Sequence, residues 1–216
     1  ARWGDLLDPH GGAADTVRKQ LRVLYDKSFR DDPTRIMRGL RYHARLGFAF
    51  EARTLGLIAR DRQFISNLSA ARVRAELERM LAEDARAEVM RSADGLGVLA
   101  AIHPALKAGP GVLAALGKTP AEAAGTLYAL AVLAVALVPE EAEQVVARLQ
   151  PPREWREVIL AAPRFRSVAD VLLAGRVAPG QVVEALDAFP LPVVLAQREV
   201  ASPGPLHARL DDYLTR

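Results

Sequence analysis

The sequence is most informative at residues 28–42, which read Ser28-Phe29-Arg30-Asp31-Asp32-Pro33-Thr34-Arg35-Ile36-Met37-Arg38-Gly39-Leu40-Arg41-Tyr42. The acidic pair before the proline predicts a helix start, because aspartate caps helix N-termini and proline suits the first helical position. Apolar residues then recur at helical spacing, at Ile36, Met37, Leu40 and Ala44, before Gly47 provides a stop. We therefore expect a helix that begins at Pro33 and buries one face.

The other face of this helix is strongly basic. Arg35, Arg38 and Arg41 follow one another at a spacing of three, and Asp32 precedes Arg35 by the same spacing, so the side chains of Asp32 and Arg35 should be neighbours. A carboxylate beside a guanidinium can read C or A, because it accepts from the exocyclic amino group while the guanidinium donates to the adjacent ring acceptor. The same residues, taken alone, also fit a helix cap, a surface ion pair and solvated arginines.

Working outward from this helix, the sequence predicts further helices at residues 51–62 and 70–83, and strand character at residues 21–25. The apolar run at residues 127–138 is too short to span a membrane and predicts a buried helix. Beyond Gly95, prolines, Pro163 among them, separate Ala/Leu-rich segments. We expect an all-α fold, an elongated array of short helices in successive lobes rather than around one core.

Composition narrows the class of protein. Of the 216 residues, 50% are hydrophobic and 25% are charged, as is ordinary for a globular protein. Cysteine is absent, which excludes disulfides and thiolate metal sites and fits the cytoplasm. Residues 1–91 hold 18 basic against 13 acidic residues, whereas the rest hold 11 against 13, so the N-terminal part is the better surface for an anionic partner. The four scattered histidines form no metal-binding motif, and we expect no signal peptide at the N-terminus.

Three motifs resemble those of class II tRNA nucleotidyltransferases and bacterial poly(A) polymerases. Residues 8–15 resemble the D-P-x-G-G-x-x-D pattern that links the head and neck of this family. Residues 31–35 stand where the family has its nucleotide-reading E-D-x-x-R motif, with Asp31 in place of the glutamate. Residues 69–77 are similar to the neck signature S-x-E-R-I-x-x-E-L, with Ala71 in place of the acidic residue.

The resemblance implies roles for particular residues. Asp32 and Arg35 would select the base, while Arg38 and Arg41 would contact the incoming nucleotide. The basic neck would bind RNA, and the residues expected to do so are Arg72 and Arg74. ATP and CTP would be the substrates, and the 3′ end of a tRNA or another RNA would be the partner, with no membrane involved.

The chain departs from the family in lacking the D-x-D pair that binds Mg²⁺ in the head. We therefore expect no catalytic residue, no metal ligand and no nucleotidyl transfer from this chain alone, which would be a fragment of a longer cytoplasmic enzyme. The expected parts are a remnant of an α/β head at 1–27, the neck at 28–90, the body at 91–165 and an incomplete tail at 166–216. The choice among CCA, CC-only, A-only and poly(A) addition stays open.

Two alternatives remain at the level of sequence. The first is a standalone, non-catalytic RNA-binding helical module or adaptor. The second is a helical protein-interaction domain in which Arg35, Arg38 and Arg41, the arginine ridge, are merely solvated. Affinity for RNA that falls with salt would argue against the second alternative, because phosphate contacts release counterions.

Overall fold

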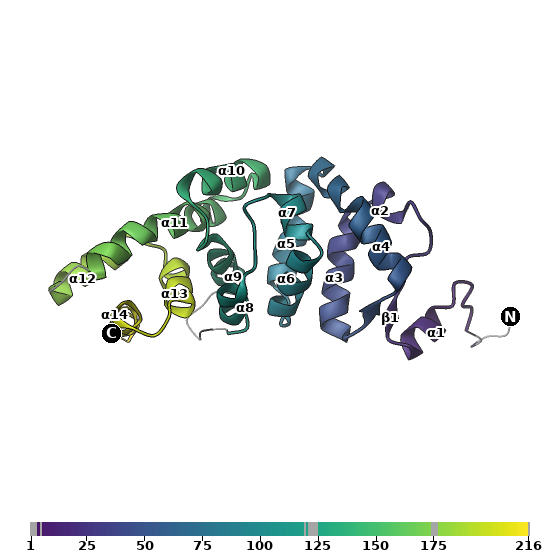
Figure 1. The fold of residues 1–216 in the computed structure, drawn as a ribbon, viewed down its shortest axis with the longest axis horizontal. Coiled ribbons are helices and arrows are strands. Elements are labelled where there is room, and N and C mark those ends of the chain that lie inside the picture. The colour runs from purple at the N-terminus through teal and green to yellow at the C-terminus, as the bar shows by residue number, and fades with distance from the viewer. Residues whose placement is uncertain (1–3, 5, 119, 121–124, 174–176, 216) are drawn as a thin grey trace.

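The structure, a computed structural model, describes residues 4, 6–118, 120, 125–173 and 177–215. In this part of the chain nearly all regular structure is helical, which confirms the expected fold class (Figure 1). The elements are α1 (Gly12–Val17), β1 (Gln20–Leu21), α2 (Ser28–Asp31), α3 (Thr34–Leu46), β2 (Ala49–Phe50), α4 (Ala52–Asp61), the 3₁₀-helix η1 (Arg62–Asn67), α5 (Ala70–Leu81), α6 (Arg86–Gly95), α7 (Val98–Ile102), α8 (Pro110–Leu116), α9 (Gly125–Ala134), α10 (Pro139–Leu149), α11 (Arg153–Leu173), α12 (Pro179–Asp187), α13 (Leu191–Val200) and α14 (Pro205–Leu214).

Helix α3 follows the sequence prediction closely. Its predicted apolar residues Ile36, Met37 and Leu40 are fully buried, and Gly47 ends the helix in the left-handed conformation with φ 65°. The start lies one residue later than expected, because Pro33 is the residue before the first helical turn and Asp32 is extended, with φ −148° and ψ 94°. Asp32 therefore stands outside the helix rather than on its face.

The strand prediction is only partly confirmed. Strand β1 is two residues long and pairs in parallel with β2, with Gln20 opposite Ala49 and Leu21 opposite Phe50. The rest of the segment, residues 22–25, has no strand partner among the described residues. The pairing lays the N-terminal segment against the end of α3 (Figure 1).

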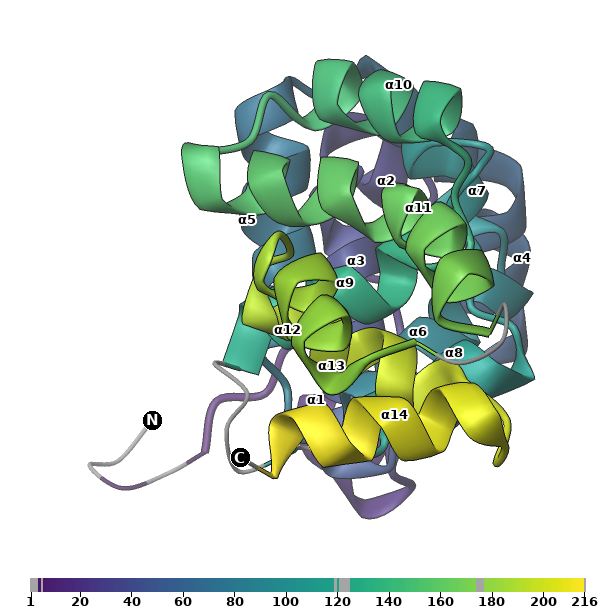
Figure 2. The ribbon, with the colours of Figure 1, turned by 90° about the vertical axis from the view of Figure 1, so that its left-hand side faces the viewer.

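The C-terminal helices pack around α9. As predicted, α9 is a buried helix, with residues 128–134 all buried, and it contacts both α11 and α13. Figure 2 shows α10 and α11 lying above α13 and α14. The expected break at Pro163 is wrong, because α11 runs through this residue, which is buried. Packing of its apolar face offsets the roughly 3 kcal/mol that an interior proline costs a helix.

The expectation of separate cores is also wrong. Buried side chains form one continuous cluster that extends from Phe29 to Leu210 through nearly every helix of the array. The array is elongated nonetheless, with α1 toward one end and α12 and α14 toward the other (Figure 1). A chain of short helices can therefore be long and still share a single core, because the buried side chains of neighbouring helices are in contact along its whole length.

Two arginines join the N-terminal helices to α10. Arg148 of α10 donates to the carbonyl oxygens of Ile65 at 3.0 Å, Leu68 at 3.1 Å and Ile102 at 3.3 Å. In the opposite direction, Arg74 of α5 donates to the carbonyl oxygens at the C-terminal end of α10, those of Leu149, at 2.9 Å, and Gln150. Each guanidinium thus binds carbonyl groups at or near the C-terminal ends of η1, α7 or α10.

Candidate functional site

The site predicted from sequence lies at the start of α3, where Asp32 is held from two sides. Its Oδ1 accepts hydrogen bonds from the backbone N–H of Thr34 at 3.1 Å and from the Thr34 hydroxyl at 2.6 Å. The same oxygen accepts a bond from Arg72 at 2.7 Å. Partial burial raises the pKa of Asp32, but the bonds from Thr34 and the charge of Arg72 outweigh it and hold the pKa below its usual value. Asp32 is therefore a fixed, ionised acceptor.

Arg72 reaches Asp32 from the first turn of α5. Ser69 caps this helix, since its hydroxyl oxygen accepts from the Arg72 N–H at 3.4 Å. The Arg72 side chain keeps 52% of its surface exposed while it forms the ion pair. The residue expected to bind RNA thus also ties the start of α5 to the start of α3.

Arg35 is held by a different set of partners. Its Nη1 donates to the hydroxyls of Tyr25 and Ser28, both at 2.9 Å. Through this bond to Tyr25 above all, the pKa of Arg35 is raised. No ion pair joins Arg35 to Asp32 in the described part of the chain, because Asp32 precedes the helix instead of lying on its face. Asp32 and Arg35 are therefore only three positions apart in the chain, but different partners orient their side chains.

The two remaining arginines of the ridge differ from each other. Arg38 is exposed and makes no ion pair or hydrogen bond with any described residue. Arg41 is mostly buried; its Nε donates to Glu83 at 2.8 Å, and its Nη1 lies 3.6 Å from Glu76. Glu83 also accepts two bonds from Arg45. Within the described residues, Arg38 thus has no counter-ion, whereas Arg41 belongs to a network of ion pairs that joins α3 to Glu76 and Glu83.

Beside this helix start lies an open cavity of about 410 Å³. Its polar lining includes the arginines Arg35 and Arg38, and two half-exposed tyrosines, Tyr25 and Tyr42, lie at its wall. Arg22 also lines it but is paired with Asp15 at 2.8 Å. None of the described residues that line the cavity carries a carboxylate. An anionic ligand with an aromatic ring suits this lining, because guanidinium groups bind phosphates and aromatic rings stack on bases.

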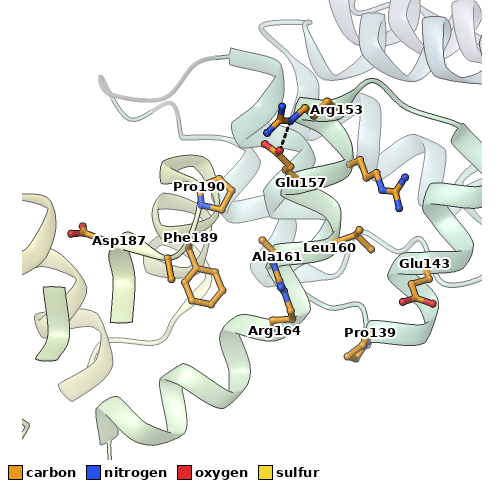
Figure 3. A pocket seen from close by; sticks show the side chains of 12 residues that line it. Pro139, Glu143, Arg153, Glu157, Leu160, Ala161, Arg164, Asp187, Phe189 and Pro190 are labelled. Atoms are coloured by element: carbon orange, nitrogen blue, oxygen red, sulfur yellow. Dashed lines mark hydrogen bonds and ion pairs between the residues drawn. The ribbon is translucent and has the colours of Figure 1, made fainter. Parts of the chain in front are cut away.

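A larger cleft, of about 860 Å³, lies along α11 and is less suited to a polyanion (Figure 3). Its arginines are matched in number by carboxylates among the described residues, so no net charge remains; the charged residues are Glu143, Arg153, Arg156, Glu157, Arg164 and Asp187. One pair, Arg153 with Glu157, is joined by a hydrogen bond of 2.7 Å (Figure 3). Size alone therefore does not identify the site, and the electrostatics favour the cavity beside α3.

Sequence reasoning missed Tyr25 and Thr34, which orient the two central side chains. Thr34 could have been found, since a threonine two residues after an aspartate commonly donates to its carboxylate in a turn. Tyr25 carried no signal, because its contact with Arg35 spans ten positions across a loop and α2. Within the described residues, no group of three or more His, Asp or Glu side chains could hold a metal ion. The described helices also include none long and apolar enough to cross a membrane.

Parts of the chain are similar in sequence to known proteins. Residues 47–109 match a family model described as a probable RNA and SrmB-binding site of polymerase A. An A-adding tRNA nucleotidyltransferase of Geobacter sulfurreducens is 37% identical over 116 residues, which cover 53% of this chain and 13% of that protein. A CCA-adding enzyme of Coxiella burnetii is 28% identical over 76% of this chain and 44% of its own length.

Solved structures show the same fold. A CCA-adding enzyme in complex with ATP has a TM-score of 0.79 at 22% identity, over 97% of this chain and 52% of that chain. The Thermotoga maritima CCA-adding enzyme complexed with tRNA has a TM-score of 0.76 at 22% identity, over 95% and 53%. The chain thus spans about half the length of these structures, and less than half of the two sequence relatives.

In fold and in sequence, the chain is similar to the helical part of tRNA nucleotidyltransferases. More particularly, the chain resembles the C-terminal part of proteins of the CCA-adding type, which confirms the resemblance drawn from its motifs.

Proposed function

We propose that this chain is the nucleotide-selecting and tRNA-binding portion of an RNA 3′-end nucleotidyltransferase that adds CMP and/or AMP in the cytoplasm. ATP and CTP are then the substrates and the tRNA 3′ end is the partner, in line with the similar enzymes whose structures hold ATP, CTP or tRNA. The neck comprises residues 28–90, the body 91–165 and the tail 166–216, after the end of a head at 1–27. The chain by itself transfers no nucleotide.

One observation carries the proposal: each of the two central side chains has one edge fixed and one edge open. Oδ1 of Asp32 is occupied, while Oδ2 has no hydrogen-bond partner among the described residues. Nη1 of Arg35 is occupied, while its Nε and Nη2 are equally open within the described chain. An open acceptor and open donors, already oriented, suit the amino group and adjacent ring nitrogen of C or A.

The other expected residues have supporting roles in this proposal. Arg38, which has no described counter-ion, binds the triphosphate. Arg41 keeps only Nη2 for the nucleotide and otherwise joins α3 to Glu83. Arg72 contacts RNA with its exposed surface while it orients Asp32. Arg74 contributes to RNA binding chiefly by holding α10 in place.

The described residues do not fit a Mg²⁺ site, and we assign no step to that ion. Of the acidic side chains near the site, Asp32 is paired with Arg72, Glu83 with Arg41 and Arg45, and Asp31 accepts from the Tyr25 hydroxyl; among the described residues no three such side chains come together. The metal ligands of the proposed parent enzyme therefore belong outside these residues.

Nucleotide discrimination tests the proposal directly. We expect the chain to bind CTP and ATP more tightly than UTP and GTP, because the latter place a carbonyl opposite the Asp32 carboxylate. Asp32→Ala should reduce the ratio of CTP to UTP affinity about 10- to 100-fold, since one bidentate contact is worth roughly 1–3 kcal/mol. Titration of each nucleotide by calorimetry measures this ratio.

Asp84→Ala, which removes an exposed carboxylate that forms no described ion pair, serves as the control and should leave the ratio unchanged. Thermal melting of both variants checks that they fold, because Asp32→Ala also removes the acceptor of the Thr34 N–H and hydroxyl at the start of α3. An Asp32→Ala protein that still prefers CTP over UTP by the wild-type ratio would contradict the assignment.

Salt-dependent tRNA binding tests the RNA-handling role. We expect the affinity for tRNA to fall steeply with salt, and Arg72→Ala to reduce the slope of log K against log[salt] by about 1, since each phosphate contact contributes about 0.9. Arg156→Ala, in the charge-balanced cleft, is the matched control and should leave the slope unaltered. Binding that does not vary with salt would instead favour a helical protein-interaction domain.

A further inference from the structure

Tyr25 lies in the loop before α2, and its side chain contacts that of Arg35. Its hydroxyl donates its single proton to Oδ2 of Asp31 at 3.0 Å. The hydroxyl oxygen is then available as an acceptor, and Nη1 of Arg35 donates to it at 2.9 Å. The hydrogen bonds therefore have one consistent direction, from Arg35 through Tyr25 to Asp31.

This arrangement restricts the guanidinium of Arg35 to one orientation. Its Nη1 bonds to Tyr25 and also to both the hydroxyl, at 2.9 Å, and the carbonyl oxygen, at 3.4 Å, of Ser28. The guanidinium carbon lies 5.9 Å from the centre of the Tyr25 ring, within range of a cation–π contact. With Nη1 held on this side, the planar fork presents Nε and Nη2 on the other.

We propose that Tyr25 is a specificity-determining positioning residue, which orients the open edge of Arg35 for base recognition in the cavity beside α3. The inference rests on the proposed function and adds a residue outside the D-D-x-x-R motif to it. Tyr25 acts on the base through Arg35, and its ring, 43% exposed, also lines the cavity. An arginine with free rotation would donate to the carbonyl of U or G as well as to the ring nitrogen of C or A, so its orientation determines selectivity.

The test is Tyr25→Phe, which removes only the hydroxyl and keeps the ring. We expect the ratio of CTP to UTP affinity to fall about tenfold, while affinity for inorganic tripolyphosphate, which Arg38 binds, stays within twofold of wild type. Arg156→Ala is the control, because Arg156 is exposed, has no described partner and lines the charge-balanced cleft along α11 rather than this cavity. It should change neither quantity.

The outcomes separate this inference from the proposed function. A wild-type chain that discriminates CTP from UTP, with a Tyr25→Phe variant that does so equally well, overturns the role of Tyr25 and leaves the proposed function standing. A Tyr25→Phe variant that loses nucleotides and tripolyphosphate in equal measure also overturns it, because the hydroxyl would then support the fold of the cavity in general. A wild-type chain that binds no nucleotide overturns both.

Discussion

Replacing Arg148 by alanine is expected to lower the free energy of unfolding by about 3–5 kcal/mol. The guanidinium donates to four carbonyl oxygens, those of Ile65 and Ser66 in η1, of Leu68 after it and of Ile102 in α7. A hydrogen bond to a charged group contributes roughly 1.5–3 kcal/mol, and each carbonyl left without a donor in a part-buried site adds a desolvation penalty. Because the bonds share one side chain, their contributions do not simply add.

Urea unfolding monitored by circular dichroism measures this loss. Arg156→Ala removes an exposed arginine without a described partner from the neighbouring helix α11, and should change stability by less than about 0.5 kcal/mol. Arg148→Lys should fall between the two, since one ammonium cannot reach carbonyls on both η1 and α7. If Arg148→Ala is no less stable than Arg156→Ala, the arginine does not hold these elements together.

The sequence predicted helices better than it predicted how they are joined. Ile36, Met37 and Leu40 repeat at the helical period, so α3 and its buried face followed from the pattern. Pro163 did not break α11, because packing of the surrounding residues outweighs local propensity. The single core was also not predictable, since periodicity shows which face of a helix is buried but not which helix covers it.

For the candidate site, the sequence indicated which residues carry the chemistry, but it did not indicate which other residues orient their side chains. Asp32 and Arg35 were expected to pair because of their spacing, yet a non-helical Asp32 turns to Arg72, forty positions later. Arg41 and Arg38 look alike in sequence, but only the first meets carboxylates brought close by folding. Contacts of this range come from the packing of α3 on α5, which no local pattern encodes.

The second large effect is expected from Glu83→Ala, which should lower the free energy of unfolding by about 3–5 kcal/mol. Glu83 is buried, with a side chain only 7% exposed, and accepts bonds from Arg41 and Arg45. Removing one partner of a buried ion pair leaves the other charge uncompensated, and Arg41 is itself only 17% exposed. The exposed Glu78→Ala on α5, where the structure shows no ion pair, is the control and should be nearly neutral.

The pH dependence gives this prediction a definite sign. Hydrogen bonds from Arg45, and then from Arg41, lower the pKa of Glu83 despite its burial. Its contribution to stability is therefore complete above the unfolded pKa of about 4.3 and is lost as the pH falls through the folded value. The stability difference between wild type and Glu83→Ala should shrink on acidification. Asp61 and Asp32, whose pKa values are also lowered, are present in both proteins and cancel in the difference.

Glu83 also connects stability to the proposed selection of nucleotides. The ion pairs of Glu83 hold α3, which carries Arg35, close to the end of α5. The first turn of α5 carries Arg72, which fixes Asp32. The two helices thus position the two side chains proposed to contact the base, Arg35 and Asp32. We therefore expect Glu83→Ala to weaken discrimination between CTP and UTP at temperatures where the protein is still folded. Unchanged discrimination would mean that the contact between Arg72 and Asp32 alone sets the geometry of the site.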